Sequence, residues 1–533
     1  MTSKLLLFLL LCFQFQVFAQ EDAWVYLTDK EDVATSLANP ISILTQKAID
    51  RKQAHAVPID VRDVPVNETY ISQLKTQAGI TVLAKSKWFN AVHVRGIQTD
   101  INNLLGLAFV DHIVFADNNL NARVGEPKKK FDLEALRTSF NYGSAANQIE
   151  MIQGDALHID NYTGTGITIA VIDAGFPNVN TMGGFQRLRD NNGILGGYDF
   201  YDRNPDVYAN TSSSHGTVVL STMAGYIENE YVGTAPDASY YLFRTENAPV
   251  ENPIEESLWV EAAERADSLG VDIINSSLGY KTYDNPNYTH SDSDLDGLTT
   301  YISKGANIAF EKGILVVNSA GNAGADGLNA PADAAGVFTI GGVKANGDYA
   351  TFSSQGSAFQ PTQKPDVATQ GQASVVISTS NTIVTSSGTS FSSPIMAGAL
   401  ACLWQALPSL SNAEIMQLVR ESASQYNSPD YFIGYGIPNM AMALNQGLSI
   451  EAVEVFQEQI EVYPNPVFNE LHISLPSNEK QVQVTVLNIL GKKVLEADVL
   501  ESTIINVSSL AKGVYLLKMK TQNGTITKKL IKK

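Results

Sequence analysis

The sequence is poor in cysteine, in basic residues and in long apolar runs, and each shortage excludes a class of protein. Cysteine occurs only at positions 12 and 402. Cys12 lies in a segment that we expect to be removed, so the mature chain cannot form an intrachain disulfide. The 36 basic residues stand against 55 acidic ones, which argues against nucleic acid as a partner because phosphate binding requires clustered Lys and Arg. No cluster of His and Cys indicates zinc.

The first residues predict a removable signal peptide, residues 1–19. A charged start at Lys4 leads into the apolar residues 5–12, and the segment ends on the small residue Ala19. A membrane anchor is one alternative, but so short a run cannot cross a hydrocarbon core about 30 Å thick. A lipid-modified Cys12 is another, which the bulky Leu11 before it disfavours. No other stretch is long enough to cross a membrane, so we expect a secreted or cell-surface protein without a transmembrane anchor.

The 533 residues predict about three or four folded units, of which residues 20–125 form a small α+β unit. Val25 and Leu27 alternate in a strand, and residues 71–78 have a helical pattern. Strands at 81–85, 91–95 and 110–115 and a helix at 98–105 complete the order β-α-β-β-α-β. The polar stretch 118–131, which contains Pro127 and three lysines, predicts an exposed linker where the chain can be cut.

Residues 126–450 predict an α/β domain with a parallel sheet between helices, because apolar strands alternate with helical stretches. The expected strands are residues 168–172, 271–274, 314–317, 337–340 and 375–378. One expected helix begins at His215, and three others span residues 258–269, 299–311 and 390–407. Ligands of such sheets bind beyond the carboxyl ends of the strands, where Asp173 and the loop 275–280 lie.

Residues 455–533 predict a compact antiparallel β-sandwich. Tyr463-Pro464-Asn465-Pro466 forms a stiff entry, and turns are expected at Gly491 and Gly513. The expected strands are residues 471–475, 482–487, 504–507, 514–518 and 526–530.

Three short motifs carry the residue types of nucleophilic catalysis. Asp173 ends an apolar run, His215 begins an apolar helical pattern, and Ser390 follows Gly388-Thr389 at the start of another. A serine nucleophile requires an activated hydroxyl, and the positive end of a helix stabilises the oxyanion that forms beside it. A histidine that titrates near neutrality can move the proton, and a carboxylate after an apolar strand must be paired. Taken singly, each residue has a structural alternative: a capping Ser, a surface His or a turn Asp.

In this order, Asp173, His215 and Ser390 resemble the catalytic triad of the subtilisin-like (S8, subtilase) serine proteases, over about residues 140–450. The resemblance implies a three-layer parallel-sheet fold and peptide hydrolysis through an acyl-enzyme. Asn322 corresponds to the asparagine of the oxyanion hole. Ser277 and Gly279 correspond to the segment that binds the substrate backbone by β-addition.

The motifs depart from the pattern of that family at several places. Phe391-Ser392 follows the serine where Met-Ala is usual, and both side chains are expected to point into the helix packing. Ser393-Pro394 is expected in the first helical turn, where Pro is tolerated. Ala174 stands where Ser or Thr is usual, which predicts one hydrogen bond fewer to Asp173. Tyr280 replaces a common Gly and is expected to narrow the substrate cleft.

Both ends of the chain resemble domains of known families. Residues 20–125 have the order of subtilase propeptides, which implies that this unit is an intramolecular inhibitor; an unrelated accessory domain is the alternative. Residues 455–533 resemble the C-terminal sorting domain of the Bacteroidota type IX secretion system, through the entry at Tyr463, the turn 488–492, the segment 510–515 and the terminal lysines. This implies the type IX machinery as a partner and export through the periplasm and outer membrane. A generic carbohydrate- or protein-binding β-module is the alternative.

Asp292, Asp294 and Asp296, followed by Gly297, have the spacing of a calcium loop. The position of its bidentate Glu is occupied by Ser303, so a solvated acidic loop is the favoured interpretation and Ca²⁺ the alternative. The predicted catalysis requires no cofactor.

The sequence therefore predicts a secreted serine endopeptidase that acts on proteins or peptides. One alternative is an inactive subtilase-fold protein for surface binding or adhesion, although such proteins generally lose a triad residue or the oxyanion asparagine. A serine esterase is another, but it usually has Gly-x-Ser-x-Gly and the order Ser…Asp…His. Here Ser392 occupies the second glycine position.

Overall fold

The computed structural model describes residues 20–533 except 122–139, 211, 476–480, 501–502 and 522–523. The chain forms two compact units, Met1–Ala441 and Met442–Lys533. The predicted signal peptide and most of the predicted cleavable linker lie outside the described residues. No helix in the described part of the chain is both long and apolar enough to span a membrane.

The N-terminal domain, residues 20–121, has the predicted order of elements. Its antiparallel sheet runs β2-β3-β1-β4, with β1 Gln20–Leu27, β2 Thr81–Ser86, β3 Ala91–Ile97 and β4 Val110–Phe115. Helices α3 Glu68–Lys75 and α4 Gln98–Asn103 cover one face, where Val25 and Val92 pack with Ile71. Two helices that the sequence analysis did not predict, α1 Val33–Ala38 and α2 Gln46–Ala54, lie between β1 and α3.

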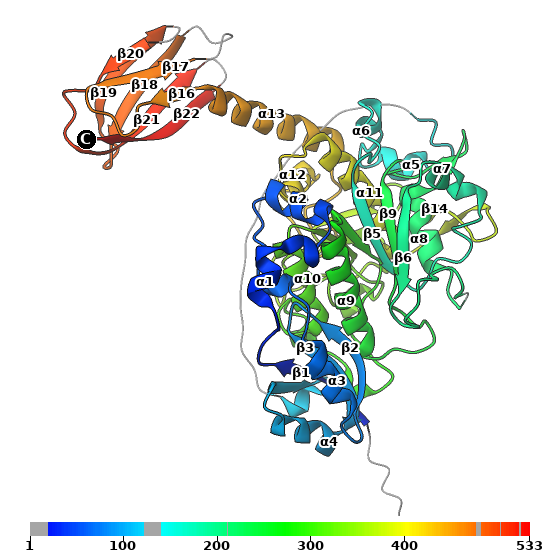
Figure 1. The fold of residues 1–533 in the computed structure, drawn as a ribbon. Coiled ribbons are helices and arrows are strands. Elements are labelled where there is room, and N and C mark those ends of the chain that lie inside the picture. Colours follow the sequence, from blue (N-terminus) through cyan, green and yellow to red (C-terminus); the bar gives the residue numbers. More distant parts are fainter. Residues whose placement is uncertain (1–19, 122–139, 211, 476–480, 501–502, 522–523) are drawn as a thin grey trace, which may run out of the picture. The chain divides into compact units, whose positions relative to one another are not determined.

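The central domain, residues 140–441, is built on a parallel sheet, as predicted, and this sheet has seven strands (Figure 1). Adjacent strands are parallel throughout, in the order β13-β12-β11-β10-β5-β9-β6. Their bounds are β5 Thr168–Asp173, β6 Ile194–Asp199, β9 Ser239–Arg244, β10 Ile273–Ser276, β11 Leu315–Ser319, β12 Val337–Val343 and β13 Val367–Gln370.

Helices cover both faces of this sheet. On one face, α8 His215–Ala224 packs against α11 Thr389–Ala406, and on the other, α9 Ile254–Leu269 packs against α10 Tyr301–Glu311. The neighbouring residues Ile274 and Asn275 of β10 show the division. Ile274 packs with α9 and α10, whereas Asn275 accepts a hydrogen bond from Ser393 of α11, and adjacent residues of a strand point to opposite faces. Shorter helices are α5 Ala146–Glu150, α6 Asp155–Ile159, α7 Gln186–Asp190 and α12 Asn412–Ser422.

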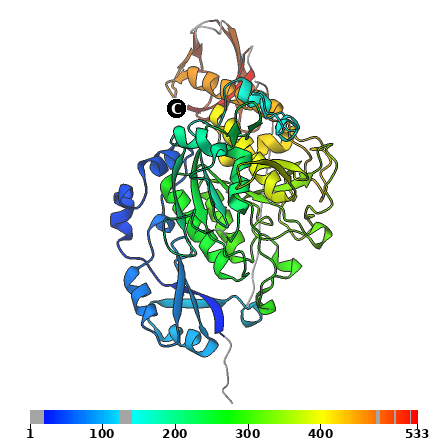
Figure 2. The ribbon, with the colours of Figure 1, turned by 90° about the vertical axis from the view of Figure 1, so that its right-hand side faces the viewer.

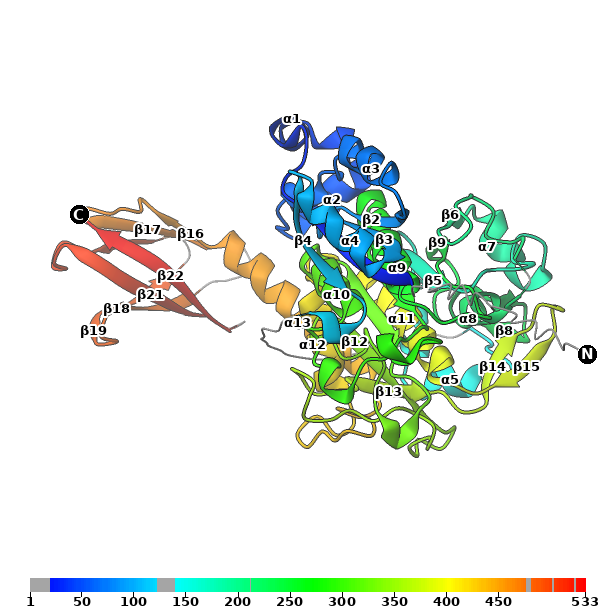
Figure 3. The same ribbon diagram turned by 90° about the horizontal axis from the view of Figure 1, so that it is seen from below.

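The N-terminal sheet packs its second face on α9 and α10 (Figures 2 and 3). Trp24 and Trp88 enter the same core as Trp259 of α9. The carboxylate of Glu264 on α9 accepts hydrogen bonds from the Ser86 hydroxyl and from the backbone N–H groups of Lys87 and Trp88. Residues that are far apart in the sequence thus form one continuous core.

One predicted strand belongs to another sheet. Residues 375–378 were expected in the parallel alternation, but β14 Ser374–Ile377 pairs antiparallel with β15 Ile383–Ser386. A short apolar run does not show which sheet it joins. The sequence pattern also missed β6, β9 and β13 of the parallel sheet, of which β6 contains two glycines and has a weak apolar signal.

The C-terminal unit is the predicted antiparallel sandwich, preceded by α13 Met440–Gln459. One sheet runs β16-β17-β20 and the other β19-β18-β21-β22, and both line one core that includes Leu471, Val484 and Leu517. Strands β16 and β19 were not predicted. The bounds are β16 Glu461–Tyr463, β17 Glu470–Ser474, β18 Gln481–Asn488, β19 Lys493–Leu500, β20 Thr503–Asn506, β21 Gly513–Thr521 and β22 Gly524–Lys532.

Candidate active site

Asp173 and His215 are in direct contact at the carboxyl end of the parallel sheet. Asp173 is the last residue of β5 and is fully buried, and its Oδ1 lies 2.8 Å from Nδ1 of His215, the first residue of α8. Gly216 makes this approach possible, because a Cβ there would lie 2.5 Å from the Gly175 carbonyl oxygen and 3.0 Å from the Cβ of Asp173. The sequence motif His-Gly therefore sets how closely α8 begins against β5.

The two carboxylate oxygens of Asp173 have different surroundings. Oδ1 accepts hydrogen bonds from His215 and, at 2.7 Å, from the Ala174 backbone N–H. Oδ2 is buried and has no hydrogen-bond partner among the described residues. This agrees with the expectation that alanine at position 174 leaves Asp173 with one hydrogen bond fewer.

The electrostatics around His215 favour its protonated form. Burial by itself lowers the pKa of His215, but the charge and hydrogen bond of Asp173, with the charge of Glu246, outweigh burial and raise it above the usual value. Glu246 is itself buried, which raises its pKa to about 7. The sequence analysis missed Glu246. Its position just past the carboxyl end of β9 was the available signal, but β9 was not predicted.

Ser390 is the second residue of α11, and its neighbours hold the helix start in place. Pro394 lies beyond the first turn, which corrects the prediction, and its missing N–H leaves the Ser390 carbonyl without an intrahelical donor. The hydroxyl of Ser277 donates to that carbonyl at 3.0 Å instead. The buried side chain of Ser277 thus anchors the start of α11, and the predicted substrate contact of Ser277 concerns its backbone.

Asn322 lies beside the residue that precedes Ser390. Its Oδ1 accepts hydrogen bonds from the Thr389 backbone N–H at 2.8 Å and from the Thr389 hydroxyl at 3.2 Å. Thr389 also accepts a hydrogen bond from the Gly321 N–H. With the oxygen held in this way, the amide NH₂ of Asn322 can donate to a ligand, as an oxyanion hole requires.

The contact between α8 and α11 brings His215 and Ser390 to the same end of the sheet. The rings of His215 and Phe391 lie 6.3 Å apart between centroids, and Phe391 is buried, so its packing extends to the histidine. None of the hydrogen bonds among the described residues joins the Ser390 hydroxyl to His215. Catalytic hydrogen bonds are often long without substrate and tighten when it binds.

The segment after β10 carries the other predicted substrate residue, Gly279, which is exposed. A Cβ there would lie 2.8 Å from the Cβ of Asn329. Tyr280 was expected to narrow the cleft. Its side chain instead turns inward, is buried, and donates a hydrogen bond to Glu246 at 2.5 Å.

The three aspartates of the possible calcium loop do not converge on a common point. Asp292 pairs with Lys281 at 2.8 Å, and Asp294 accepts hydrogen bonds from Ser291. Asp296 accepts from the backbone of the next turn. In the described part of the chain, no group of three His, Cys, Asp or Glu side chains could hold a metal ion. The placement of these carboxylates does not fit a bound cation.

Comparison with known proteins identifies the family. The model of the subtilase family matches residues 164–436, about half of the chain. The chain belongs to the subtilase family. Two further family models match its ends: the Bacteroidota peptidase S8 propeptide domain over residues 22–132 and the secretion system C-terminal sorting domain over residues 461–533.

Curated relatives of this subtilase are bacterial subtilisins. Subtilisin E of Bacillus subtilis is 30% identical over 304 residues, which cover 55% of this chain and 70% of the relative. Subtilisin DY of Bacillus licheniformis is 28% identical over 302 residues, covering 55% of this chain and 97% of the relative. A crystal structure of MycP1 without its N-terminal propeptide matches 56% of this chain and 96% of that one, with 22% identity and a TM-score of 0.45.

These findings establish the broad character of the protein. The protein is a member of the subtilases, which are a family of serine peptidases. It also has an S8 propeptide domain and a C-terminal sorting domain of the type IX secretion system. The sorting domain indicates export to the cell surface or the medium.

Proposed function

We propose that this subtilase is a secreted serine endopeptidase with the triad Asp173, His215 and Ser390. The observation that carries the proposal is the 2.8 Å contact between Asp173 and His215, with Ser390 at the start of the adjoining helix. His215 accepts the proton of the Ser390 hydroxyl as its oxygen attacks the scissile carbonyl, and later returns it to the leaving amine. Asp173 orients the imidazole and stabilises its charged form.

Asn322 and the backbone N–H of Ser390 stabilise the tetrahedral oxyanion in this mechanism. The held orientation of the Asn322 amide supports that role. Water then hydrolyses the acyl-enzyme with His215 as the base. The backbone of Ser277 and Gly279 binds the substrate backbone by β-addition, while the Ser277 side chain holds the helix that carries the nucleophile. The reaction itself requires no metal or cofactor.

The proposed organisation is a signal peptide at 1–19, a propeptide at 20–125, a peptidase domain at 126–450 and a sorting domain at 455–533. The propeptide is an intramolecular inhibitor, and the type IX machinery recognises the sorting domain. The bonds from Ser86, Lys87 and Trp88 to Glu264 support a propeptide that folds against the peptidase domain.

Replacement of the nucleophile tests this function. Ser390→Ala should abolish casein hydrolysis and labelling by a fluorophosphonate probe while leaving the fold intact, because only a hydroxyl is removed. Ser387→Ala changes a nearby serine, whose hydroxyl accepts a bond from the Ala373 N–H, and should retain both activities. Normal activity in purified Ser390→Ala protein would refute the triad.

The same two assays on the wild-type protein, with short esters as a further substrate, distinguish the endopeptidase from a binding protein and from an esterase. Absence of labelling in the processed wild-type protein would indicate an inactive binding or adhesion protein. Cleavage of short esters without cleavage of casein would indicate an esterase.

A further inference from the structure

A segment of the propeptide domain leaves its own sheet and packs on the peptidase domain. Residues 28–67, between β1 and α3, contain α1, α2 and the 3₁₀ turn Val61–Asp63, none of which the order β-α-β-β-α-β requires. We call residues 45–63 the docking segment. It lies against the C-terminal ends of α9 and α10, at Asp267, Gly270, Lys312 and Gly313, which we call the docking face.

Helix α2 presents two adjacent cations to this face. Ala48, Arg51 and Lys52 are buried at the spacing of one helix face. Arg51 lies 2.5 Å from Asp267 Oδ1 and also donates to the Val271 carbonyl oxygen. Lys52 Nζ lies 2.7 Å from the same Asp267 oxygen.

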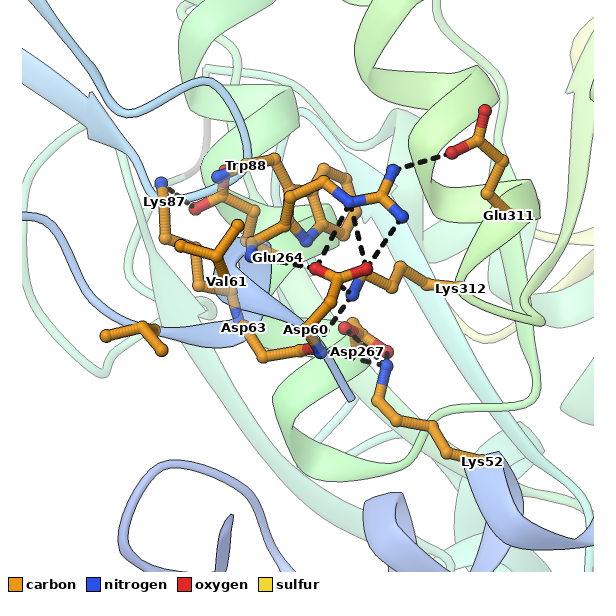
Figure 4. A network of polar contacts seen from close by, with 12 residues as sticks. Lys52, Asp60, Val61, Asp63, Lys87, Trp88, Glu264, Asp267, Glu311 and Lys312 are labelled. Carbon is orange, nitrogen blue, oxygen red and sulfur yellow. Dashed lines mark hydrogen bonds and ion pairs between the residues drawn. The ribbon is translucent and has the colours of Figure 1, made fainter. Parts of the chain in front are cut away.

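The network continues as a chain of alternating charge across the boundary between the domains (Figure 4). Lys52 lies 3.3 Å from Asp63, and Asp63 lies 2.7 Å from Lys312. None of these side chains is more than 1% exposed. The propeptide domain contributes Lys52 and Asp63, and the peptidase domain contributes Asp267 and Lys312. In this chain of four side chains each domain therefore supplies one buried acid and one buried base, and the propeptide domain adds the buried cation of Arg51.

The two charges of the docking face depend on the propeptide for their partners. In the part of the chain that the structure describes, every ion pair of Asp267 and Lys312 is to a propeptide residue. A buried charge that loses its partner is costly, and a pair gains little over an apolar substitute. The network therefore confers selectivity for its own partner more than raw affinity.

The backbones also fit closely at this place. Gly270 ends α9 with a left-handed conformation, and a Cβ there would lie 2.6 Å from the Ala48 nitrogen. The Thr45 N–H donates to the Ser268 carbonyl oxygen at 3.0 Å. At the end of α10, a Cβ on Gly313 would lie 3.0 Å from Val57 Cγ2. Larger residues at these two helix ends would push the docking segment away.

We propose that the docking face is a binding site for the propeptide in addition to both the substrate cleft and the sheet contact on α9 and α10, and that its ligand is the docking segment of this chain. The face lies across the sheet from α8 and α11, which carry His215 and Ser390. It holds the propeptide on the enzyme after the chain is cut between the two domains. This proposal concerns a different face from the triad, and stands whether or not the triad assignment is correct.

The test uses the full-length Ser390→Ala protein with recognition sites for an unrelated, sequence-specific protease at both ends of residues 122–139. Cutting at both sites removes any linker residue that could occupy the substrate cleft. The N-terminal fragment should then co-elute with the rest of the chain in gel filtration, and should remain bound at about 1 M salt because buried pairs are screened little. Its release from this protein on cutting would overturn the proposal.

Matched variants identify which contacts retain the fragment. Lys52→Met removes the charge at similar length. Asp267 keeps Arg51 and Asp63 keeps Lys312, so the loss of the Lys52 contacts should weaken binding of the cut fragment about tenfold or more. Lys75→Met, on the exposed face of α3, should not weaken it. On the other domain, Gly270→Ala should release the fragment. Gly166→Ala has a similar positive φ and no atom within 4 Å of the added Cβ, so it should not.

The two variant pairs act on different domains, so a folding failure in one leaves the other informative. If the Lys52→Met and Gly270→Ala proteins both retain the cut N-terminal fragment as well as their controls do, the docking segment is not needed. The sheet contact through Glu264 would then bind the propeptide by itself. If either variant releases the fragment while its control retains it, the result supports the proposal.

Discussion

One oxygen of the Asp173 carboxylate is used twice, and the other is buried without a partner among the described residues. A buried acceptor without a donor costs about 1–3 kcal/mol. Glu246, whose pKa is raised to about 7, adds a second negative charge near the same imidazole when it is ionised. At the scale of single residues, this site is therefore biased towards a charged histidine.

The pH dependence of activity should reflect this bias. His215 must be neutral to accept the serine proton, so kcat/KM should fall as the pH is lowered through a pKa above that of an ordinary histidine. Glu246→Gln removes a carboxylate that favours the imidazolium to the extent that it is ionised, so it should lower this pKa and extend activity to lower pH. The measurement is kcat/KM against pH, with Glu261→Gln on α9 as the control. An acid limb that does not move in Glu246→Gln would show that Glu246 does not act on His215.

The amide of Asn322 should matter mainly in the transition state. Asn322→Ala should lower kcat by about 10²–10³, the loss known for such a donor in subtilisin, with little change in KM. Asn346→Ala, a turn asparagine bonded to Asp348, is the control for a general effect of the substitution. Steady-state kinetics on a peptide substrate provide the measurement, and an unchanged kcat would show that the oxyanion assignment is wrong.

At the scale of elements, close contacts between helices depend on small residues. Gly305 lies within α10, which the sequence pattern predicted as a helix in spite of it. A Cβ at this position would lie 2.5 Å from Val260 Cγ2 of α9. The glycine therefore allows α9 and α10 to pack together, and the propeptide sheet rests on this helix pair.

Gly305→Ala should destabilise the protein although alanine is the better helix former. The gain in helix propensity is about 1 kcal/mol, whereas overpacking of a dense core costs about 1–3 kcal/mol. Val260→Ala in addition should restore stability beyond the sum of the single effects, because it makes room for the new methyl group. Urea unfolding of the Ser390→Ala background, followed by tryptophan fluorescence, measures this coupling. Additive effects would contradict the packing explanation.

At the scale of the whole molecule, the two compact units have separate hydrophobic cores. The core of the C-terminal sandwich consists of residues from 460 onward, and the core around α9 contains none of them. A unit with its own core can fold without the other. Sorting and catalysis can therefore be separated in this chain.

Deletion of residues 455–533 should leave the peptidase domain folded but stop export across the outer membrane. Folded protein, active or still with its propeptide, should then accumulate in the periplasm, because the removed unit matches a sorting domain. Fractionation of cells that express the truncated and full-length forms measures the distribution. Normal secretion of the truncated form would indicate that the sandwich is a binding module.

The sequence alone was sufficient for the features that local patterns encode. The period-two strands of the N-terminal domain, the apolar strand before Asp173 and the helices after His215 and Ser390 follow from the spacing of apolar residues. The unpartnered Oδ2 of Asp173 agrees with the expectation about Ala174, which concerns an adjacent residue. The motifs around Asp173, His215 and Ser390 were sufficient to indicate the family.

Only the tertiary structure decided which distant residues meet. The carboxylate of Glu246 acts on His215, Ser277 holds the carbonyl of Ser390, and α2 docks on α9, yet no local pattern relates these pairs. For the same reason the apolar run at residues 374–377 could not reveal its antiparallel partner. Local spacing determines which element forms and which face it buries. The packing of whole elements determines what that face touches, because such contacts join residues whose separation in the sequence carries no signal.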